Sequence, residues 1–335
     1  MTQDTPQSRR LGAIIAPALL LLVLLGAVAA NGGLRRMLVE AVHTMDPRAV
    51  LAVLPVQLLA IVLCTAAQQA LNVGIPFGAS FIARLTRDAA HNLLIFPPGL
   101  GEVVGARVVV LLGGRGRAAV ALRVLDVAAE VIAELPYMGL AGWVIWRWWH
   151  QGGDLGQAPA GGVSWGWAAL ALPVGAYAAW RLWRRSGHHA RWMRSRHGRL
   201  VRAEIHLMRR ELIRQRAGMP LAILCHFLAW GLSGVQVWIA AQIFGLHLSL
   251  FGALAVESAA TSARVILFFI PGGLVMQEAG AVLAGAAMGV AAPQALALSL
   301  VLRLRDVCFG SALLLWPALE YRRRAAGVSA PVQPG

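Results

Sequence analysis

Four ionisable residues lie at helical spacing inside an otherwise apolar stretch of the chain. Asp126, Glu130 and Glu134 follow Arg123 by three, seven and eleven residues, so all four share one stripe of a helix. A charge deep in a lipid-like medium costs roughly 3 kcal/mol or more, so the stripe is expected to face protein or water, with Arg123 paired to Asp126. Net negative charge then remains on Glu130 and Glu134. The alternative for Arg123 and Asp126 is an ordinary ion pair at a helix end.

A second pair of charges lies in the C-terminal half. Glu257 and Arg264 are seven residues apart, which places them on one face of an apolar helix. A buried ion pair and the lining of a polar cavity both explain this spacing.

Two apolar regions are interrupted by proline and glycine, and polar residues follow each break. Glu102 and Arg107 follow the first break, and Gln277 and Glu278 follow the second. Glycine there permits positive φ and close backbone approach, and exposed amides at a helix start can hold an anion such as a phosphate. A glutamate at this position is equally explained as a cap that stabilises the helix dipole. The residues of the two breaks are Pro97, Pro98, Gly99, Pro271, Gly272 and Gly273.

The interrupted regions, residues 75–112 and 248–290, belong to an internal repeat. The two Pro-Gly motifs are 174 residues apart. Residues 122–127 match residues 302–307, 180 positions on, so Arg303 and Asp306 correspond to Arg123 and Asp126. An odd number of expected spans separates the copies. This pattern predicts an inverted repeat whose two re-entrant hairpins meet near the membrane midplane.

The other residues that could take part in catalysis or metal binding form no catalytic pattern. The histidines at 188, 189, 197 and 206 are interleaved with arginines and lack acidic neighbours that would complete a metal site. Cys64, Cys225 and Cys308 lie far apart in apolar stretches. The sequence therefore predicts no catalytic residue, no metal and no cofactor, and we expect the protein not to be an enzyme.

The elements that must position these residues are membrane helices. A hydrophobic content of 58%, a charged content of 13% and a mean hydropathy of +0.65 lie far from the norm for soluble proteins. Several stretches reach the ~20 apolar residues that cross a bilayer. The predicted fold is all-α and polytopic, with six spans and the two broken hairpins. The spans are expected at residues 11–30, 49–71, 118–147, 163–180, 219–244 and 293–316.

The net charge of +15 does not indicate nucleic-acid binding, because it is concentrated beside these spans. Residues 181–216 contain twelve arginines and two glutamates. Such clusters stay on the cytoplasmic side and attract anionic headgroups. With the other basic groups at 9–10, 84–87, 115–117 and 322–324, they predict a multi-pass protein of the bacterial cytoplasmic (inner) membrane with both termini cytoplasmic.

The expected organisation has four parts. Residues 1–180 form the first membrane half and residues 217–320 the second. The arginine-rich cytoplasmic segment, 181–216, joins them, and residues 321–335 form a cytoplasmic tail.

The motifs also resemble a known family. They are Asn92, Pro98-Gly99-Leu100-Gly101-Glu102, Arg107, Glu257, Pro271-Gly272-Gly273-Leu274, Gln277-Glu278 and Arg303-x-Arg305-Asp306. This combination is similar to the lysylphosphatidylglycerol-synthase transmembrane-region family, also called flippase-like. The context of Glu257 and residues 270–280 look closest to its hopanoid-biosynthesis-associated branch. The resemblance implies a helical membrane domain that moves or holds lipids.

Three functions compete on these grounds. The first is a lipid flippase-like protein for a phospholipid or hopanoid-type amphiphile, whose headgroup path holds the polar residues named above. The second is a scaffold that does not transport and gathers lipid-biosynthetic membrane proteins on its basic segment. The third, an intramembrane transferase, has Asp126 and Glu102 as its candidate residues. The expected partners are membrane lipids and, for the scaffold, those biosynthetic proteins, with no nucleic acid.

Overall fold

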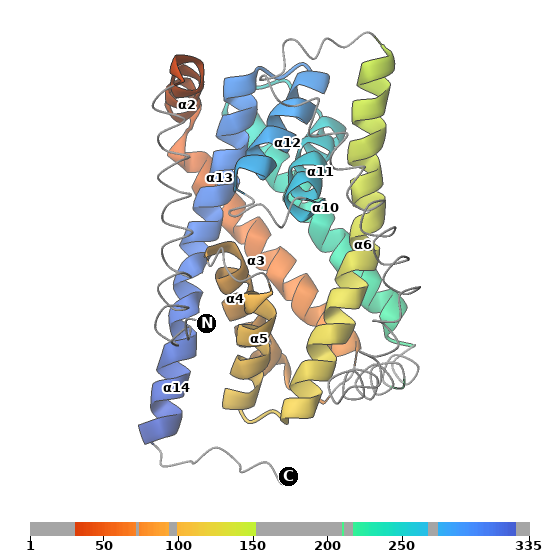
Figure 1. Cartoon of the computed structure of the whole chain (residues 1–335), viewed down its shortest axis with the longest axis vertical. Helices are drawn as coiled ribbons and strands as arrows, with labels where there is room; N and C mark the ends of the chain where they lie inside the picture. The colour runs from red at the N-terminus through yellow and green to blue at the C-terminus, as the bar shows by residue number, and fades with distance from the viewer. Residues whose placement is uncertain are drawn as a thin grey trace, which may run out of the picture.

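The computed structural model describes residues 31–71, 74–93, 99–151, 210, 217–266 and 274–325. The expected spans 11–30 and 163–180 lie outside the described residues, as do the arginine-rich segment apart from Arg210 and most of the two Pro-Gly breaks. The described part is built from helices, and it contains no strand (Figure 1). The helices are α2 (Gly32–Thr44), α3 (Pro47–Ala70), α4 (Phe77–Leu93), α5 (Leu100–Leu111), α6 (Gly116–His150), α10 (Met219–Ile243), α11 (Leu250–Ile266), α12 (Leu274–Ala287), α13 (Ala292–Gly310), the 3₁₀ turn η2 (Ser311–Leu314) and α14 (Leu315–Ala325).

Helices α3 and α10 are the two described helices that are long and apolar enough to cross a membrane, with mean hydropathies of 2.5 and 1.5. Asp46 caps α3 by accepting a hydrogen bond from the Arg48 backbone amide at 2.8 Å, and Pro47 occupies the first helical position. The two helices agree with the spans predicted at 49–71 and 219–244. The span predicted at 118–147 falls within the longer helix α6.

The span expected at 293–316 coincides with α13, η2 and the first residues of α14, which follow one another without a gap as α-helix, 3₁₀ turn and α-helix. Pro317 has no amide hydrogen to donate to the Leu313 carbonyl, so a regular α-helix is interrupted before it and the backbone tightens into a 3₁₀ turn. Gly310 also packs directly against Leu93 at the end of α4. Helix α2, capped by the Asn31 side chain, was not predicted from hydropathy.

The same order of elements occurs twice. A long helix (α3), a helical hairpin (α4 and α5) and a second long helix (α6) are followed later by α10, α11 with α12, and α13. Helices α4 and α11 each have 17 residues, and α3 and α10 have 24 and 25. Figure 1 shows the first hairpin in the lower half of the molecule and the second in the upper half, with α3 and α10 crossing between them.

The equivalent helices α3 and α10 are antiparallel. Gln236 donates a hydrogen bond to Gln57 at 3.2 Å, whereas Gly218, before the start of α10, lies against Ala70 at the end of α3. Increasing residue number on one helix therefore matches decreasing number on the other.

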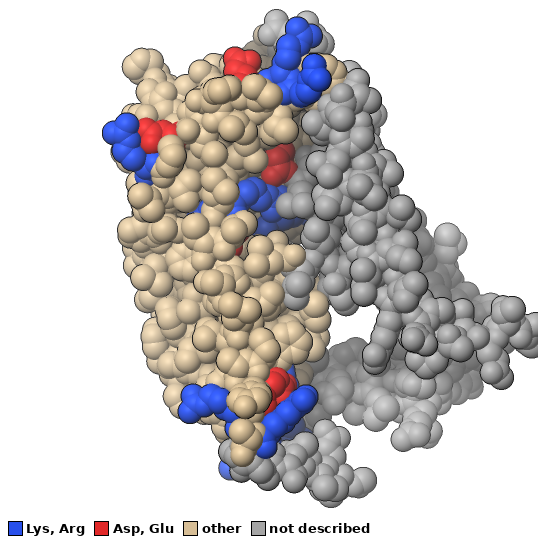
Figure 2. Space-filling view, turned by 90° about the vertical axis from the view of Figure 1, so that its left-hand side faces the viewer, with Lys and Arg blue, Asp and Glu red and all other residues tan. Residues whose placement is uncertain are grey.

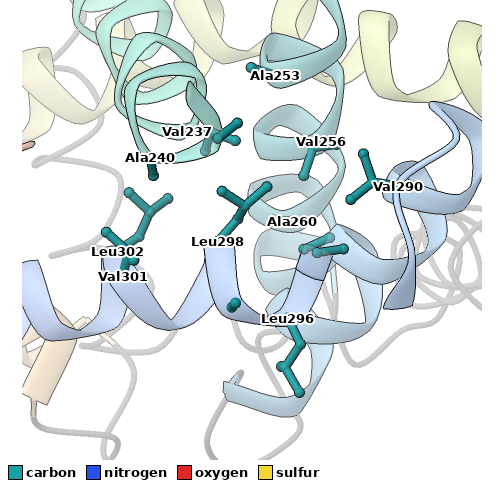
Figure 3. Packing of buried hydrophobic residues seen from close by; sticks show 14 of the residues in the cluster. Val237, Ala240, Ala253, Val256, Ala260, Val290, Leu296, Leu298, Val301 and Leu302 are labelled. Atoms are coloured by element: carbon teal, nitrogen blue, oxygen red, sulfur yellow. The ribbon is translucent and has the colours of Figure 1, made fainter. Parts of the chain in front are cut away.

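The second hairpin is closed by small residues. A β-carbon on Gly280 of α12 would lie 2.5 Å from the Ala259 carbonyl oxygen of α11, so the two backbones touch. Figure 3 shows the apolar core beside this contact, where α10, α11 and α13 meet through side chains such as Val237, Val256 and Leu298. Close approach through glycine and alanine is the usual way that helices associate in lipid.

The outer surface is apolar over most of its height. Figure 2 shows charged side chains at both ends of one face and a further charged group in its upper half, with a broad uncharged region below that group. Leu51, Val103, Val131 and Leu228 are among the large apolar side chains exposed on the outside of the helices. A surface of this kind suits a lipid environment.

Replacing Gly280 by alanine should lower stability by about 1–3 kcal/mol, because the new β-carbon overpacks against a backbone carbonyl that has no room to move. The measurement is the unfolding temperature of the purified protein in detergent. Gly139→Ala on the exposed face of α6, where a β-carbon meets nothing within 4 Å, is the matched control and should leave this temperature unchanged or slightly higher. Equal effects of the two changes would contradict the packing.

Candidate functional site

A cavity of about 330 Å³, partly open to the outside, lies between the helices of the bundle. Its walls come from both hairpins and from α3, α6, α10 and α13. The charged groups that line it are Arg84, Arg87, Arg264 and Arg305, with Asp88, Glu102, Glu130, Glu134, Glu257 and Asp306. Four guanidinium groups thus face six carboxylates within a mostly apolar molecule.

The first charge cluster is centred on Asp126, which is completely buried beneath the cavity. Its carboxylate contacts Gln68 of α3 at 2.8 Å, His226 of α10 at 2.9 Å and Arg84 of α4 at 3.4 Å. Arg123, one turn earlier on α6, lies 3.6 Å away and is also buried. The predicted pairing of Arg123 with Asp126 is confirmed, and the alternative of a surface pair is wrong because both side chains are inside.

The cluster continues through two arginines of the first hairpin. Glu130 accepts hydrogen bonds from Arg84 and Arg87, each at 3.0 Å. Asp88 pairs with the same two arginines at 3.0 and 2.8 Å, and Arg87 also pairs with Glu102 of α5. This network holds α4, α5 and α6 together, and its two arginines neutralise the charge of Glu130.

A smaller cluster occupies the second half. Arg305 pairs with Asp306 at 2.8 Å and donates to Gln236 at 2.7 Å, while Gln236 donates to Gln57 on the antiparallel helix α3. In each half, a glutamine of a long helix therefore contacts a charged side chain of the repeated motif. The motif lies at 123–126 in the first half and at 303–306 in the second.

Two carboxylates that line the cavity have no ion pair among the described residues. Glu134 is 6% exposed and its Oε1 atom has no hydrogen-bond partner. Glu257 is 5% exposed, and the Thr261 hydroxyl donates to it at 3.2 Å. Glu257 does not pair with Arg264, so the sequence interpretation of these two residues as a cavity lining is the correct one.

The ends of the two hairpins meet beside these carboxylates. Arg264, near the end of α11, donates to the Asn92 side-chain oxygen near the end of α4 at 3.3 Å. Gly99, which begins α5, has φ of 81°, a conformation that favours glycine. It also lines the cavity, whereas Pro97, Pro98, Pro271, Gly272 and Gly273 lie outside the described residues.

The residues that the sequence singled out separate into three groups. Those that line the cavity are Glu102, Glu130, Glu134, Glu257, Arg264, Gln277 and Asp306. Arg123 and Asp126 belong to the network behind its wall. Arg107, Glu278 and Arg303 are not among the lining residues.

These last three residues make ion pairs outside the cavity lining. Arg107 forms two hydrogen bonds to Glu320 of α14, at 2.7 and 2.9 Å, which lower the pKa of that carboxyl. Glu278 pairs with Arg303 at 2.9 Å and joins α12 to α13.

Sequence reasoning missed several lining residues. Arg84 and Arg87 were interpreted as cytoplasmic markers, but both are buried in the first cluster, so they cannot support the assignment of orientation. Arg84, Arg87, Asp88 and His91 follow a helical stripe, and this spacing could have revealed them. His226 sits alone in an apolar span and gives no such signal. No group of three metal-ligating side chains was found among the described residues.

The fold and the site define a helical membrane protein with an internal charged cavity between two helical hairpins. The model of the lysylphosphatidylglycerol synthase TM region family matches residues 11–313, and the chain belongs to this family of membrane proteins related to lipid metabolism. No match was found among curated proteins or among solved structures.

Replacing Asp126 by asparagine should destabilise the protein by about 3–5 kcal/mol, because Arg84 and Arg123 would remain buried without this anion. The measurement is again the unfolding temperature in detergent. Asp46→Asn is the control, since Asp46 pairs at the surface with the exposed Arg48 and asparagine is also a good helix cap; it should cost at most about 1 kcal/mol. A loss from Asp126→Asn no larger than from the control would contradict the buried network.

Proposed function

We propose that the protein is a lipid flippase-like transporter of the cytoplasmic membrane, not an enzyme, which shelters the headgroup of an amphiphile in its internal cavity. The observation that carries this proposal is the charged cavity itself, bordered by the ends of both hairpins inside an otherwise apolar molecule. Charged groups inside a membrane protein are costly and usually mark a pathway for a polar substrate. The lipid tail can stay in the bilayer throughout.

The two halves are proposed to form an inverted repeat, with N- and C-termini in the cytoplasm. The antiparallel arrangement of α3 and α10 supports this proposal, as does the repeated order of helix, hairpin and helix. The contacts that α3 and α10 make with the repeated motif are also alike. In the first half, Gln68 and His226 contact Asp126; in the second half, Gln236, which donates to Gln57, contacts Arg305. In transporters built this way, the substrate site lies near the midplane between the repeats.

Transport through this site requires the hairpin ends to separate. The contact between Asn92 and Arg264 is a single hydrogen bond, whereas many ion pairs hold the first hairpin to α6. Phospholipids and hopanoid-type amphiphiles both remain candidate substrates, and the hopanoid alternative rests on the sequence context around Glu257 and residues 270–280.

Blocking the cavity should stop lipid movement without removing any charge. Ser233→Trp places a large side chain in the cavity from α10. Leu228→Trp on the exposed outer face of the same helix is the control. The measurement is the transbilayer movement of fluorescently labelled phospholipids in proteoliposomes. The wild type and the control should move lipid faster than empty vesicles, and Ser233→Trp should reduce movement to their level.

Failure of the wild type to move any lipid of the native membrane would contradict transport. It would favour the scaffold that gathers lipid-biosynthetic proteins. In that event, neutralising the arginines of 181–216 should abolish function in cells, while the cavity variants should not.

A further inference from the structure

Of the three cysteines, all of which lie in described helices, only Cys64 lines the cavity. Its position follows from the antiparallel crossing of α3 and α10 (Figure 1). Gln236 of α10 pairs with Gln57 of α3, so Cys64, seven residues further along α3, lies opposite the position seven residues earlier on α10. That position is Ala229, against which Cys64 packs together with Ala60. The thiol therefore borders the cavity between small side chains.

A histidine that also lines the cavity lies beside this thiol. The ring of His226 interacts with the Cys64 side chain, and its Nε2 atom lies 2.9 Å from the Asp126 carboxylate. A carboxylate only accepts hydrogen bonds, so Nε2 donates and Nδ1 is the ring nitrogen left to accept a proton. The three side chains come from α3, α10 and α6. They are arranged as a nucleophile, a base and a carboxylate that orients the base.

The cavity wall around this group can receive an uncharged carbonyl compound. Arg84 lies close enough to Cys64 for an electrostatic interaction, which stabilises negative charge that develops on the sulfur. Trp230 and Ser233 follow His226 by four and seven residues, so the three share one face of α10, and all three line the cavity. The indole N–H and the serine hydroxyl are donors for a carbonyl oxygen. Nucleophile, base and carbonyl donors thus face the same space.

We propose that Cys64, with His226 as its base, is a covalent modification site for α,β-unsaturated carbonyl compounds, such as the aldehydes that form from oxidised lipid chains. The thiol proton passes to His226 while the sulfur forms a bond to the β-carbon. The π electron pair moves towards the carbonyl, and the proton then adds to the α-carbon. No group leaves, and no oxidant or reductant is required. The site goes beyond the proposed transport and does not depend on it.

The test measures how fast N-ethylmaleimide, itself an α,β-unsaturated carbonyl compound, modifies each cysteine of the purified full chain in detergent. The rates are followed by mass spectrometry of peptides. Cys308, which is exposed, and Cys225, which precedes His226 but does not line the cavity, are internal references. Cys64 should react at least as fast as Cys308 although it is only 7% exposed. A Cys64 rate more than about tenfold below that of Cys308 would overturn the site, because a positioned base should compensate for burial.

His226→Gln removes the base but keeps a side-chain amide that can donate to Asp126. It should slow the modification of Cys64 by at least about tenfold and leave the rate at Cys308 unchanged. Unfolding would have the opposite effect, since it exposes Cys64 and speeds its modification. An unchanged Cys64 rate in His226→Gln would overturn the role of the base.

A second variant tests access through the cavity with the base in place. Ser233→Trp fills the cavity and should slow the modification of Cys64, whereas Leu228→Trp on the outer face of α10 should not. With wild-type protein, trans-2-nonenal should add to Cys64, and the saturated aldehyde nonanal should leave no adduct there. Equal Cys64 rates in the two tryptophan variants, or no adduct with trans-2-nonenal, would overturn the proposal.

Discussion

The buried charge of Asp126 is the constraint on which the rest of the structure depends. An isolated carboxylate in an apolar interior is so costly that donors must converge on it, and here they come from α3, α4, α6 and α10. The requirement fixes where these helices cross. Arg84 does not pair with Asp126 alone, because it also pairs with Glu130 and Asp88. Arg87 in turn pairs with Glu130 and with Glu102, which lies in the other helix of the hairpin. Removing one member of such a buried network leaves its partners charged and unpaired, which is strongly destabilising.

The same constraint separates structural charges from functional ones. Where a carboxylate has two guanidinium partners, as Glu130 does, nothing remains for a ligand. Glu134 lies one helical turn further along α6 and has none, although it is less exposed than Glu130. The polar interior therefore has a compensated part that holds the first hairpin in place and an uncompensated part near the meeting point of the two hairpins. A transporter for lipid headgroups needs both a rigid frame and a polar space that a substrate can complete.

Local patterns in the sequence were sufficient for much of the fold. Uncharged apolar runs identified α3 and α10, and the Pro-Gly interruptions located both hairpins, because these features act within a single helix or turn. The helical spacing of the charged residues on α6 correctly predicted that Glu130 and Glu134 face the interior. Contacts between distant segments could not be derived this way: the interaction of Gln68 and His226 with Asp126 has no local signature. The pairing of Arg107 with Glu320 could not be predicted for the same reason, since the two residues lie 213 positions apart.

The central claim, that a lipid headgroup enters the cavity, is tested most directly by photocrosslinking in vesicles. A phospholipid with a photoreactive group on its headgroup is reconstituted with the full chain, and the labelled residues are identified by mass spectrometry. The account predicts labelling of cavity residues such as Trp230, Ser233 and Thr261. Labelling confined to the outer faces of the helices, at residues such as Leu228 and Trp238, would contradict it.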